Sequence, residues 1–425
     1  MAAGRVHIVG AGLAGLSAAV RLAVRGHRVV VYEAAPHAGG RCRSYFDAEL
    51  GCRTDNGNHL VLAANTAALQ YLDAIGAARS MIGPTEPRLD FCDLSDGARW
   101  VLAPNRGRLP WWILASGRRV PGTQALDYLR VARLRHAKAD DTIAACLDPK
   151  SQLFRRMWQP FAVAVLNTEV EAGSASLLWQ MLVESFGAGG AALRPLVPCQ
   201  GLSESFIDPA LSLLSVQAGE VRFGMRLRGL DLQGEAVSAL VFDEGQIAVG
   251  PQDSVILAVP APIAGRIRPG ITVPTEFRAI VNAHYRVDAS ADLPLVLGLI
   301  GGTAEWIFRK PGIVSVTVSA ADRLIDRPAE ALAAELWRDV TRAYRWRDAA
   351  LPAWRIVKEK RATIAATPAQ LRLRPEARTR WRNLVLAGDW TRTGMPSTIE
   401  GAVRSGHTAA RLVHDLPQPG ASGKG

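Results

Sequence analysis

The chain is poor in cysteine and lysine and lacks long hydrophobic runs. Its five cysteines are odd in number and form no Cys-x-x-Cys pair, which indicates reduced thiols rather than a disulfide framework or a zinc site. No apolar stretch reaches the roughly 18 residues of a membrane-spanning helix. A strand-length apolar run begins at Arg5, which leaves no room for a signal peptide. These absences predict a cytoplasmic protein without a metal site.

Lysine supplies only six of the 50 basic residues, and arginine supplies the other 44. Against 39 acidic residues this gives a net charge of +11. Such a charge fits either a general preference for arginine or an anionic partner. Because the basic residues look scattered rather than clustered, we expect no nucleic-acid partner. A membrane surface and a compositional bias both stay open.

With 425 residues, 48% of them hydrophobic, the chain can bury a large core, and we expect two domains. The C-terminal residues 416–425 are polar and rich in glycine and proline, which predicts a disordered tail.

The N-terminal stretch has the pattern of a strand, a helix and a second strand. Residues 5–9 and 28–32 are apolar runs of strand length, and residues 13–25 carry an alanine- and leucine-rich helical pattern. Between the first strand and the helix, three glycines have the G-x-G-x-x-G spacing of a dinucleotide-binding turn. The glycines permit a tight turn, close approach of backbone to a pyrophosphate and close helix–strand packing. A carboxylate after the second strand can accept hydrogen bonds from a ribose. We therefore expect cofactor contacts from Gly10, Gly12, Leu13, Ala14, Gly15 and Glu33.

A second glycine turn follows, in which Gly39 and Gly40 precede Arg41. It combines permissive backbone with a cation suited to a diphosphate. The segment 55–59, Asp-Asn-Gly-Asn-His, comes next. In these positions the two features resemble the FAD-dependent desaturase and amine oxidase superfamily. The resemblance implies a bound FAD and a segment 55–59 that runs past its isoalloxazine ring.

The C-terminal part of the chain resembles the same superfamily. Residues 383–389 read as a buried strand ending in Gly-Asp, and residues 396–406 open a helix that Ser397 or Thr398 would cap. In the superfamily this aspartate binds the ribityl–phosphate region, and the helix N-terminus points at the flavin pyrimidine, where its dipole stabilises negative charge. The resemblance adds to the expected FAD contacts Gly388, Asp389, Thr398, Ile399 and, at the adenine, the backbone near Leu227.

The expected fold class is α/β, with a discontinuous Rossmann-like FAD-binding domain and an inserted α+β substrate domain like that of amine oxidases and phytoene desaturases. We assign residues 1–75, 196–265 and 380–415 to the first domain. Residues 76–195 and 266–379 are assigned to the second.

The inserts point to a narrower group. Residues 118–122, 153–168, 175–179 and 280–285 resemble squalene-associated desaturases, the hydroxysqualene dehydroxylases of hopanoid pathways. The resemblance implies that an isoprenoid, hydroxysqualene, is reduced to squalene with loss of water. The 153–168 run is predicted to be helical, and Asn167 lies in this apolar helix, where a buried amide needs partners.

A dehydroxylation needs an acid that helps water leave and an apolar tunnel that excludes bulk water. Asp55 and His59 are the candidate acids, since they lie on the segment expected beside the flavin. His284 is a weaker candidate.

Three alternatives stay open. One is carotenoid or phytoene desaturation, which would use the same flavin and tunnel. The second is amine oxidation, although such enzymes carry a lysine near flavin N5 and residues 279–288 contain none. The third is a prenyl-lipid escort without a flavin, against which the intact Gly-Gly-Arg and Gly-Asp elements argue.

The stretch 106–119 sets Trp111 and Trp112 between arginines. Tryptophan suits the membrane interface and arginine suits anionic lipids. We expect either a peripheral contact with the cytoplasmic membrane face or core packing of both rings.

Overall fold

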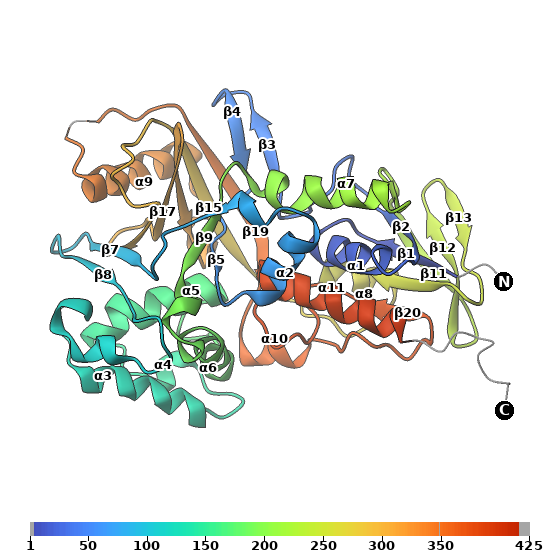
Figure 1. Ribbon diagram of the computed structural model, residues 1–425, viewed down its shortest axis with the longest axis horizontal. Helices are drawn as coiled ribbons and strands as arrows, with labels where there is room; N and C mark the ends of the chain where they lie inside the picture. The colour runs from blue at the N-terminus through green and yellow to red at the C-terminus, as the bar shows by residue number, and fades with distance from the viewer. Residues whose placement is uncertain (1–3, 348, 416–425) are drawn as a thin grey trace.

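Two β-sheets form the centres of two lobes (Figure 1). The computed structural model describes residues 4–347 and 349–415. Both ends of the described chain lie in the lobe that contains β1 (Arg5–Val9) (Figure 1). The tail predicted over 416–425 lies outside the described residues.

The sheet of the first lobe is parallel and has five strands. Its two N-terminal strands each show four buried residues in succession, as expected for a parallel strand covered on both faces. The strands predicted over 5–9 and 28–32 are confirmed. In order across the sheet the strands are β10 (Glu220–Arg222), β2 (Arg28–Tyr32), β1, β14 (Ser254–Leu257) and β20 (Leu384–Leu386).

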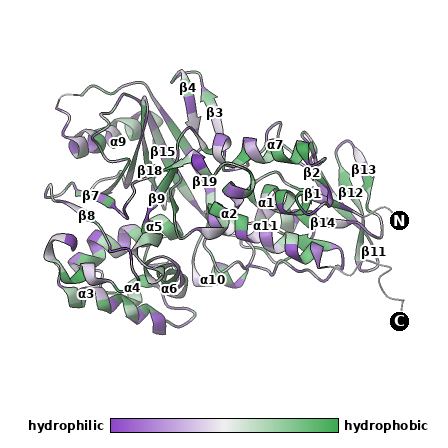
Figure 2. Cartoon of the chain, viewed as in Figure 1, coloured by the Kyte–Doolittle hydropathy of each residue, from purple (hydrophilic) through white to green (hydrophobic). Residues whose placement is uncertain are grey.

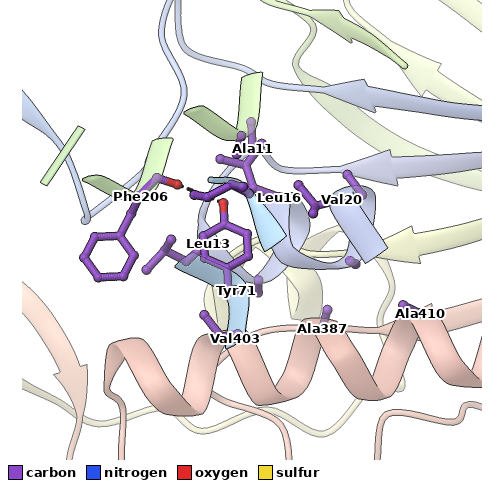
Figure 3. Close-up of a cluster of buried hydrophobic side chains, with 14 of the residues drawn as sticks. Ala11, Leu13, Leu16, Val20, Tyr71, Phe206, Ala387, Val403 and Ala410 are labelled. Atoms are coloured by element: carbon purple, nitrogen blue, oxygen red, sulfur yellow. Dashed lines mark hydrogen bonds between the residues drawn. The ribbon is translucent and has the colours of Figure 1, made fainter. Parts of the chain in front are cut away.

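One face of this sheet is covered by helices whose apolar sides share one core (Figure 3). α1 ends at Ala23, two residues before the predicted end of that helix. A Cβ on Gly406 would lie 2.0 Å from Ser17 Oγ, so α11 packs directly on α1. Figure 2 shows hydrophobic and hydrophilic residues alternating along α11, as expected for a helix with one buried side. The helices are α1 (Leu13–Ala23), α2 (Thr66–Ala74), α7 (Asp208–Val216) and α11 (Ile399–His414).

The other face carries a separate apolar core. A three-stranded antiparallel sheet and one short helix supply it. These elements are β11 (Leu227–Gln233), β12 (Ala236–Phe242), β13 (Gly245–Ala248) and α8 (Ala261–Ile267).

The second lobe is built on a seven-stranded mixed sheet. Its only parallel pairing among the described strands joins β7 to β16, so the two predicted inserts contribute to one sheet. In order the strands are β19 (Trp354–Ile364), β15 (Phe277–Arg286), β18 (Ile313–Val318), β17 (Trp306–Lys310), β16 (Val296–Ile300), β7 (Leu89–Asp93) and β8 (Arg99–Leu102).

Helices pack on both faces of this sheet and form two cores. α9 (Ala329–Tyr344) covers one face, and a group of short helices covers the other (Figure 1). That group is α3 (Ala125–Leu129), α4 (Ile143–Cys146), α5 (Gln159–Leu166) and α6 (Ala175–Glu184).

Short elements connect the lobes. They are β3 (Ser44–Asp47), β4 (Cys52–Asp55), β5 (Val61–Leu62), β6 (Met81–Ile82), β9 (Pro195–Pro198) and α10 (Pro368–Arg372).

The strands of the two large sheets come from the segments predicted for each domain, and the exact domain boundaries stay a prediction. Among the described residues no helix has both the length and the apolar character needed to cross a bilayer.

Asn167 lies just after α5 and not within a helix, which corrects the sequence-based placement. Its backbone is left-handed, with φ of 46°. Its side-chain amide donates to Thr363 Oγ1 at 2.9 Å, and its carbonyl oxygen accepts from Ala320 N at 2.6 Å. The amide therefore has the partners that burial requires, and it ties the end of α5 to β19 and to the turn after β18.

The tryptophan pair is divided between surface and core. Trp111 is 60% exposed, whereas Trp112 is 5% exposed and packs edge-on against Tyr128. The expectation that both rings share one environment is wrong, because neighbouring residues of the single 3₁₀ turn 111–114 point in different directions.

Candidate active site

The three glycines of the first turn have different structural roles. Gly10 has φ of +107°, and a Cβ there would lie 2.5 Å from Ala258 O. A Cβ on Gly15 would lie 1.9 Å from Gly10 O, so only glycine allows α1 to approach β1 this closely. At Gly12, the residue preceding α1, nothing lies within 4 Å of the Cβ position. The turn therefore leaves open space in front of the N-terminus of α1, where an anionic group is favoured.

Glu33 lies beside this space. Its carboxylate accepts hydrogen bonds from Ala11 N at 2.8 Å and from Ala35 N at 2.9 Å. Its own backbone carbonyl accepts from Met225 N at 2.9 Å, which brings the start of β11, with Leu227, to this end of the sheet. A ribose at Glu33 and an adenine at Leu227 stay predictions, and the geometry is compatible with both.

The second glycine turn packs against the first. Gly39 N donates to Ala11 O at 2.8 Å, and the Cβ position of Gly40 lies 3.6 Å from Gly12 Cα. Both glycines have positive φ, at 106° and 59°. The two turns thus border one space from two sides.

Arg41 brings the two distant ends of the chain together. Its guanidinium donates to Asp389 Oδ1 at 2.7 Å and to Ala362 O at 2.6 Å. The charge of Asp389 raises the pKa of Arg41. Although Arg41 lies deep in the protein, 45% of its side-chain surface is accessible, so it lines an internal space rather than filling it.

The loop after β20 leads to the N-terminus of α11. Gly388 N donates to Ser405 Oγ at 2.9 Å, and Thr398 Oγ1 accepts from Gly401 N at 3.1 Å, which identifies Thr398 as the capping residue. Ile399 begins the helix and is buried. The predicted cap is confirmed, and the first turn of α11 is held by its own side chains.

A buried arginine that sequence reasoning missed organises the same loop. Arg374 is 4% exposed and donates to the backbone carbonyls of Asp389, Thr391 and Met395. Burial lowers its pKa to about 10, which leaves it charged at neutral pH. In a chain with 44 arginines nothing local distinguishes this one.

Asp55 is a buried carboxylate at the end of β4. It accepts hydrogen bonds from Ser44 Oγ at 2.6 Å and Leu202 N at 2.9 Å, and it forms an ion pair with Lys310. Burial alone would raise the pKa of Asp55, but Lys310 and these hydrogen bonds hold it below the ordinary value. Asp55 is therefore ionised at neutral pH, which favours a positioning role for it over proton donation.

His59 lies four residues further along. Its Nδ1 donates to Gly57 O at 3.0 Å, because a carbonyl can only accept, and its Nε2 is left without a proton in the neutral ring. Burial lowers the pKa of His59, so the ring is neutral at pH 7. His59 stays the better candidate acid, on the condition that a nearby negative charge raises its pKa.

Polar side chains of the second lobe hold the segment between these two residues. Asn58 Nδ2 donates to Thr317 Oγ1 at 3.1 Å, and Thr317 Oγ1 donates to Asn282 Oδ1 at 2.8 Å. The two partners are paired in register on β15 and β18. Neither they nor Lys310 were found from the sequence, because their contacts with segment 55–59 span more than 220 residues.

His284 is part of a polar cluster close to Asp55. Its Nδ1 bonds with Ser315 Oγ at 2.8 Å, and burial lowers its pKa to about 4. Its Nε2 has no partner among the described residues and borders a cavity of about 20 Å³, enough for one water. His284 therefore stays a weak candidate acid, because its ring is neutral at pH 7.

These features define a dinucleotide-binding oxidoreductase fold: the paired glycine turns, the carboxylate after β2 and the open N-terminus of α1. The open Cβ position at Gly12, the accessible guanidinium of Arg41 and the capped N-terminus of α11 are compatible with FAD, and its contacts with these residues stay a prediction. The chain belongs to the flavin containing amine oxidoreductase family, whose sequence pattern matches residues 13–414.

Relatives and solved structures agree with this assignment. The chain is 47% identical over 409 residues to a hydroxysqualene dehydroxylase of Rhodopseudomonas palustris, covering 96% of this chain and 98% of that protein. It is 44% identical over 407 residues to a hydroxysqualene dehydroxylase of Zymomonas mobilis, with the same coverage. An oxidoreductase structure from Methanosarcina mazei shares the fold, with a TM-score of 0.70, 13% identity, and coverage of 96% and 100%. The chain is an FAD-dependent oxidoreductase with an amine oxidase and desaturase fold.

Proposed function

We propose that the protein reduces hydroxysqualene to squalene with loss of water. The observation that carries the proposal is the 44–47% identity, over nearly the whole chain, to proteins named hydroxysqualene dehydroxylase. In this reaction the allylic C–O bond breaks, the carbon gains a hydride, and the departing hydroxyl gains a proton to leave as water. FAD, when bound in its reduced form, would supply the hydride.

The chain's own residues have three tasks in this reaction. Asp55, fixed by Lys310, holds segment 55–59 in place. His59 lies on that segment and is the proposed proton donor, a role that requires a nearby negative charge to raise its pKa so that Nε2 carries a proton. The N-terminus of α11 offers a positive dipole end to negative charge in the cofactor space.

Anaerobic incubation of the reduced protein with hydroxysqualene tests the proposal. We expect squalene and oxidised flavin in equal amounts, measured by mass spectrometry and absorbance. Reduced free FAD without protein is the control and should give no squalene. A product with additional double bonds, or no conversion by flavin-loaded protein, would overturn the proposal.

We further propose that residues 106–138 dock on an anionic membrane surface. This segment holds eight arginines and lysines against one acidic residue, so the basic residues are not evenly scattered, contrary to the sequence-based expectation. Five large apolar side chains in it are each 59–70% exposed: Leu109, Trp111, Leu114, Leu126 and Leu129. Apolar side chains set among cations match the interface between acyl chains and anionic headgroups, where the proposed isoprenoid substrate would dissolve.

We expect Trp111→Ser to weaken binding to phosphatidylglycerol vesicles without changing the melting temperature. Because the ring is largely exposed, its removal costs little folding free energy but removes an interfacial anchor. Vesicle flotation, read at low and high salt beside a thermal melt, measures both effects. Phe46→Ser is the matched control: Phe46 is an aromatic residue, 62% exposed, on β3, far from α3 (Figure 1). Equal flotation of both variants, or flotation indifferent to salt, contradicts the docking.

A further inference from the structure

A solvent-open groove of about 460 Å³ runs beside α11, away from the glycine turns. The end of α1, residues 404–411 of α11, residues 376–377 and the loop 391–393 form its walls. Ten of its eleven lining residues have polar or charged side chains, threonines and a serine among them. The charged and titratable side chains that face it are Arg21, Glu376, Arg392, Arg404, His407 and Arg411.

The positive charge in this groove is not balanced. Arg392 pairs with Glu376 at 3.2 Å, and Arg404 is engaged by two glutamates of α6 and α11. Arg21 and Arg411 form no ion pair within residues 4–347 and 349–415. The buried Nε of Arg21 also lacks a hydrogen-bond partner there. Two guanidinium groups therefore face the same open space without an anion.

The pKa of His407 reflects the same excess of positive charge in the groove. Burial and, second, the charge of Arg21 lower the pKa of His407 to about 4. The ring is therefore neutral at pH 7, because a further positive charge beside Arg21 is disfavoured. An anion placed between His407 and Arg21 would raise the pKa again.

We propose that this groove binds a small soluble ligand carrying at least two phosphate groups, with Arg21 and Arg411 as its main cationic contacts. Guanidinium groups bind phosphate oxygens in a bidentate manner, and Thr408 adds a hydroxyl donor. The arginine side chains that line the groove suit an anionic ligand rather than an isoprenoid. The proposal does not depend on the dehydroxylase activity.

The groove is separate from the expected pyrophosphate site of FAD. Arg21 and Gly12 lie at opposite ends of α1, and nine residues of helix span about 14 Å. The loop 391–393 is held from within by Arg374, which also binds the backbone of Asp389. A ligand in the groove thus contacts a loop that Arg374 ties to the backbone of Asp389, a predicted FAD contact.

The test uses the FAD-loaded protein, so that the glycine turn is already occupied. Isothermal titration with pyrophosphate at constant ionic strength should show one saturable site per chain. Arg21→Gln and Arg411→Gln should each weaken binding about tenfold or more. Arg25→Gln is the matched control, since Arg25 is exposed and does not line the groove. Thermal melts identify any variant that fails to fold.

A second measurement follows His407 by NMR, with and without pyrophosphate. Its pKa should rise on binding in the wild type and, at the same subsaturating pyrophosphate concentration, rise less in Arg21→Gln. The absence of a saturable site, or equal weakening by Arg25→Gln, would overturn the proposal. Arg21-dependent binding to phosphatidylglycerol vesicles with no binding of pyrophosphate would also overturn it, and would assign the groove to lipid headgroups.

Discussion

A Gly12→Val variant should fold normally and yet fail to retain FAD. Gly12 has extended backbone, with φ of −75° and ψ of 177°, which any residue adopts, and its Cβ position meets no atom within 4 Å. A valine side chain would therefore cost the apoprotein little. It would fill the space in front of α1 that a pyrophosphate needs. We expect FAD affinity to fall at least about a hundredfold, roughly 3 kcal/mol.

Two measurements check this expectation. The melting temperature of the apoprotein should match that of the wild type, and fluorescence titration should show the loss of affinity. Gly15→Ala is the contrasting variant, because its Cβ would lie 1.9 Å from Gly10 O and should destabilise the apoprotein itself. Stoichiometric FAD in purified Gly12→Val protein would show that the cofactor does not pass in front of α1.

The elements that could be predicted from sequence are those with a local pattern. The strands over 5–9 and 28–32 and the cap at Thr398 follow from runs of apolar residues and from capping chemistry, so a short window of sequence suffices. The meeting of Arg41 and Asp389 spans 348 residues and followed only from resemblance to a family. Their hydrogen bond at 2.7 Å supports the predicted common site at that point.

The missed features have no local pattern. Trp111 and Trp112 are chemically identical neighbours, and only the direction of each side chain in the 3₁₀ turn separates surface from core. Arg374 differs from other arginines by its burial, which depends on the loop 389–395 that folds around it. In each case the deciding contact is made in three dimensions.

The ion pair between Asp55 and Lys310 leads to the second large expected effect. Both side chains are nearly buried, at 4% and 13% exposure. Lys310→Met would leave the Asp55 carboxylate in the interior without its cation. Breaking a buried pair in this way costs about 3–5 kcal/mol of unfolding free energy at pH 7. Urea denaturation measures the loss, and Lys360→Met on the exposed part of β19 should change stability by less than about 0.5 kcal/mol.

The pH dependence of this loss of stability distinguishes an effect of charge from an effect of packing. In the wild type the pKa of Asp55 is depressed, so its stabilising contribution is present above the unfolded pKa of about 3.9 and is lost as the pH falls through the lower folded value. In Lys310→Met, burial raises the pKa of Asp55 instead, because the attraction that opposed burial is gone. Protonation then relieves the penalty, and the stability deficit of the variant should shrink between pH 7 and pH 5.

The double variant Asp55→Asn with Lys310→Met should be more stable at pH 7 than Lys310→Met alone, since no unpaired charge is left. A deficit that is the same at every pH, or a double variant no better than the single one, would show that Lys310 acts by packing and not by charge.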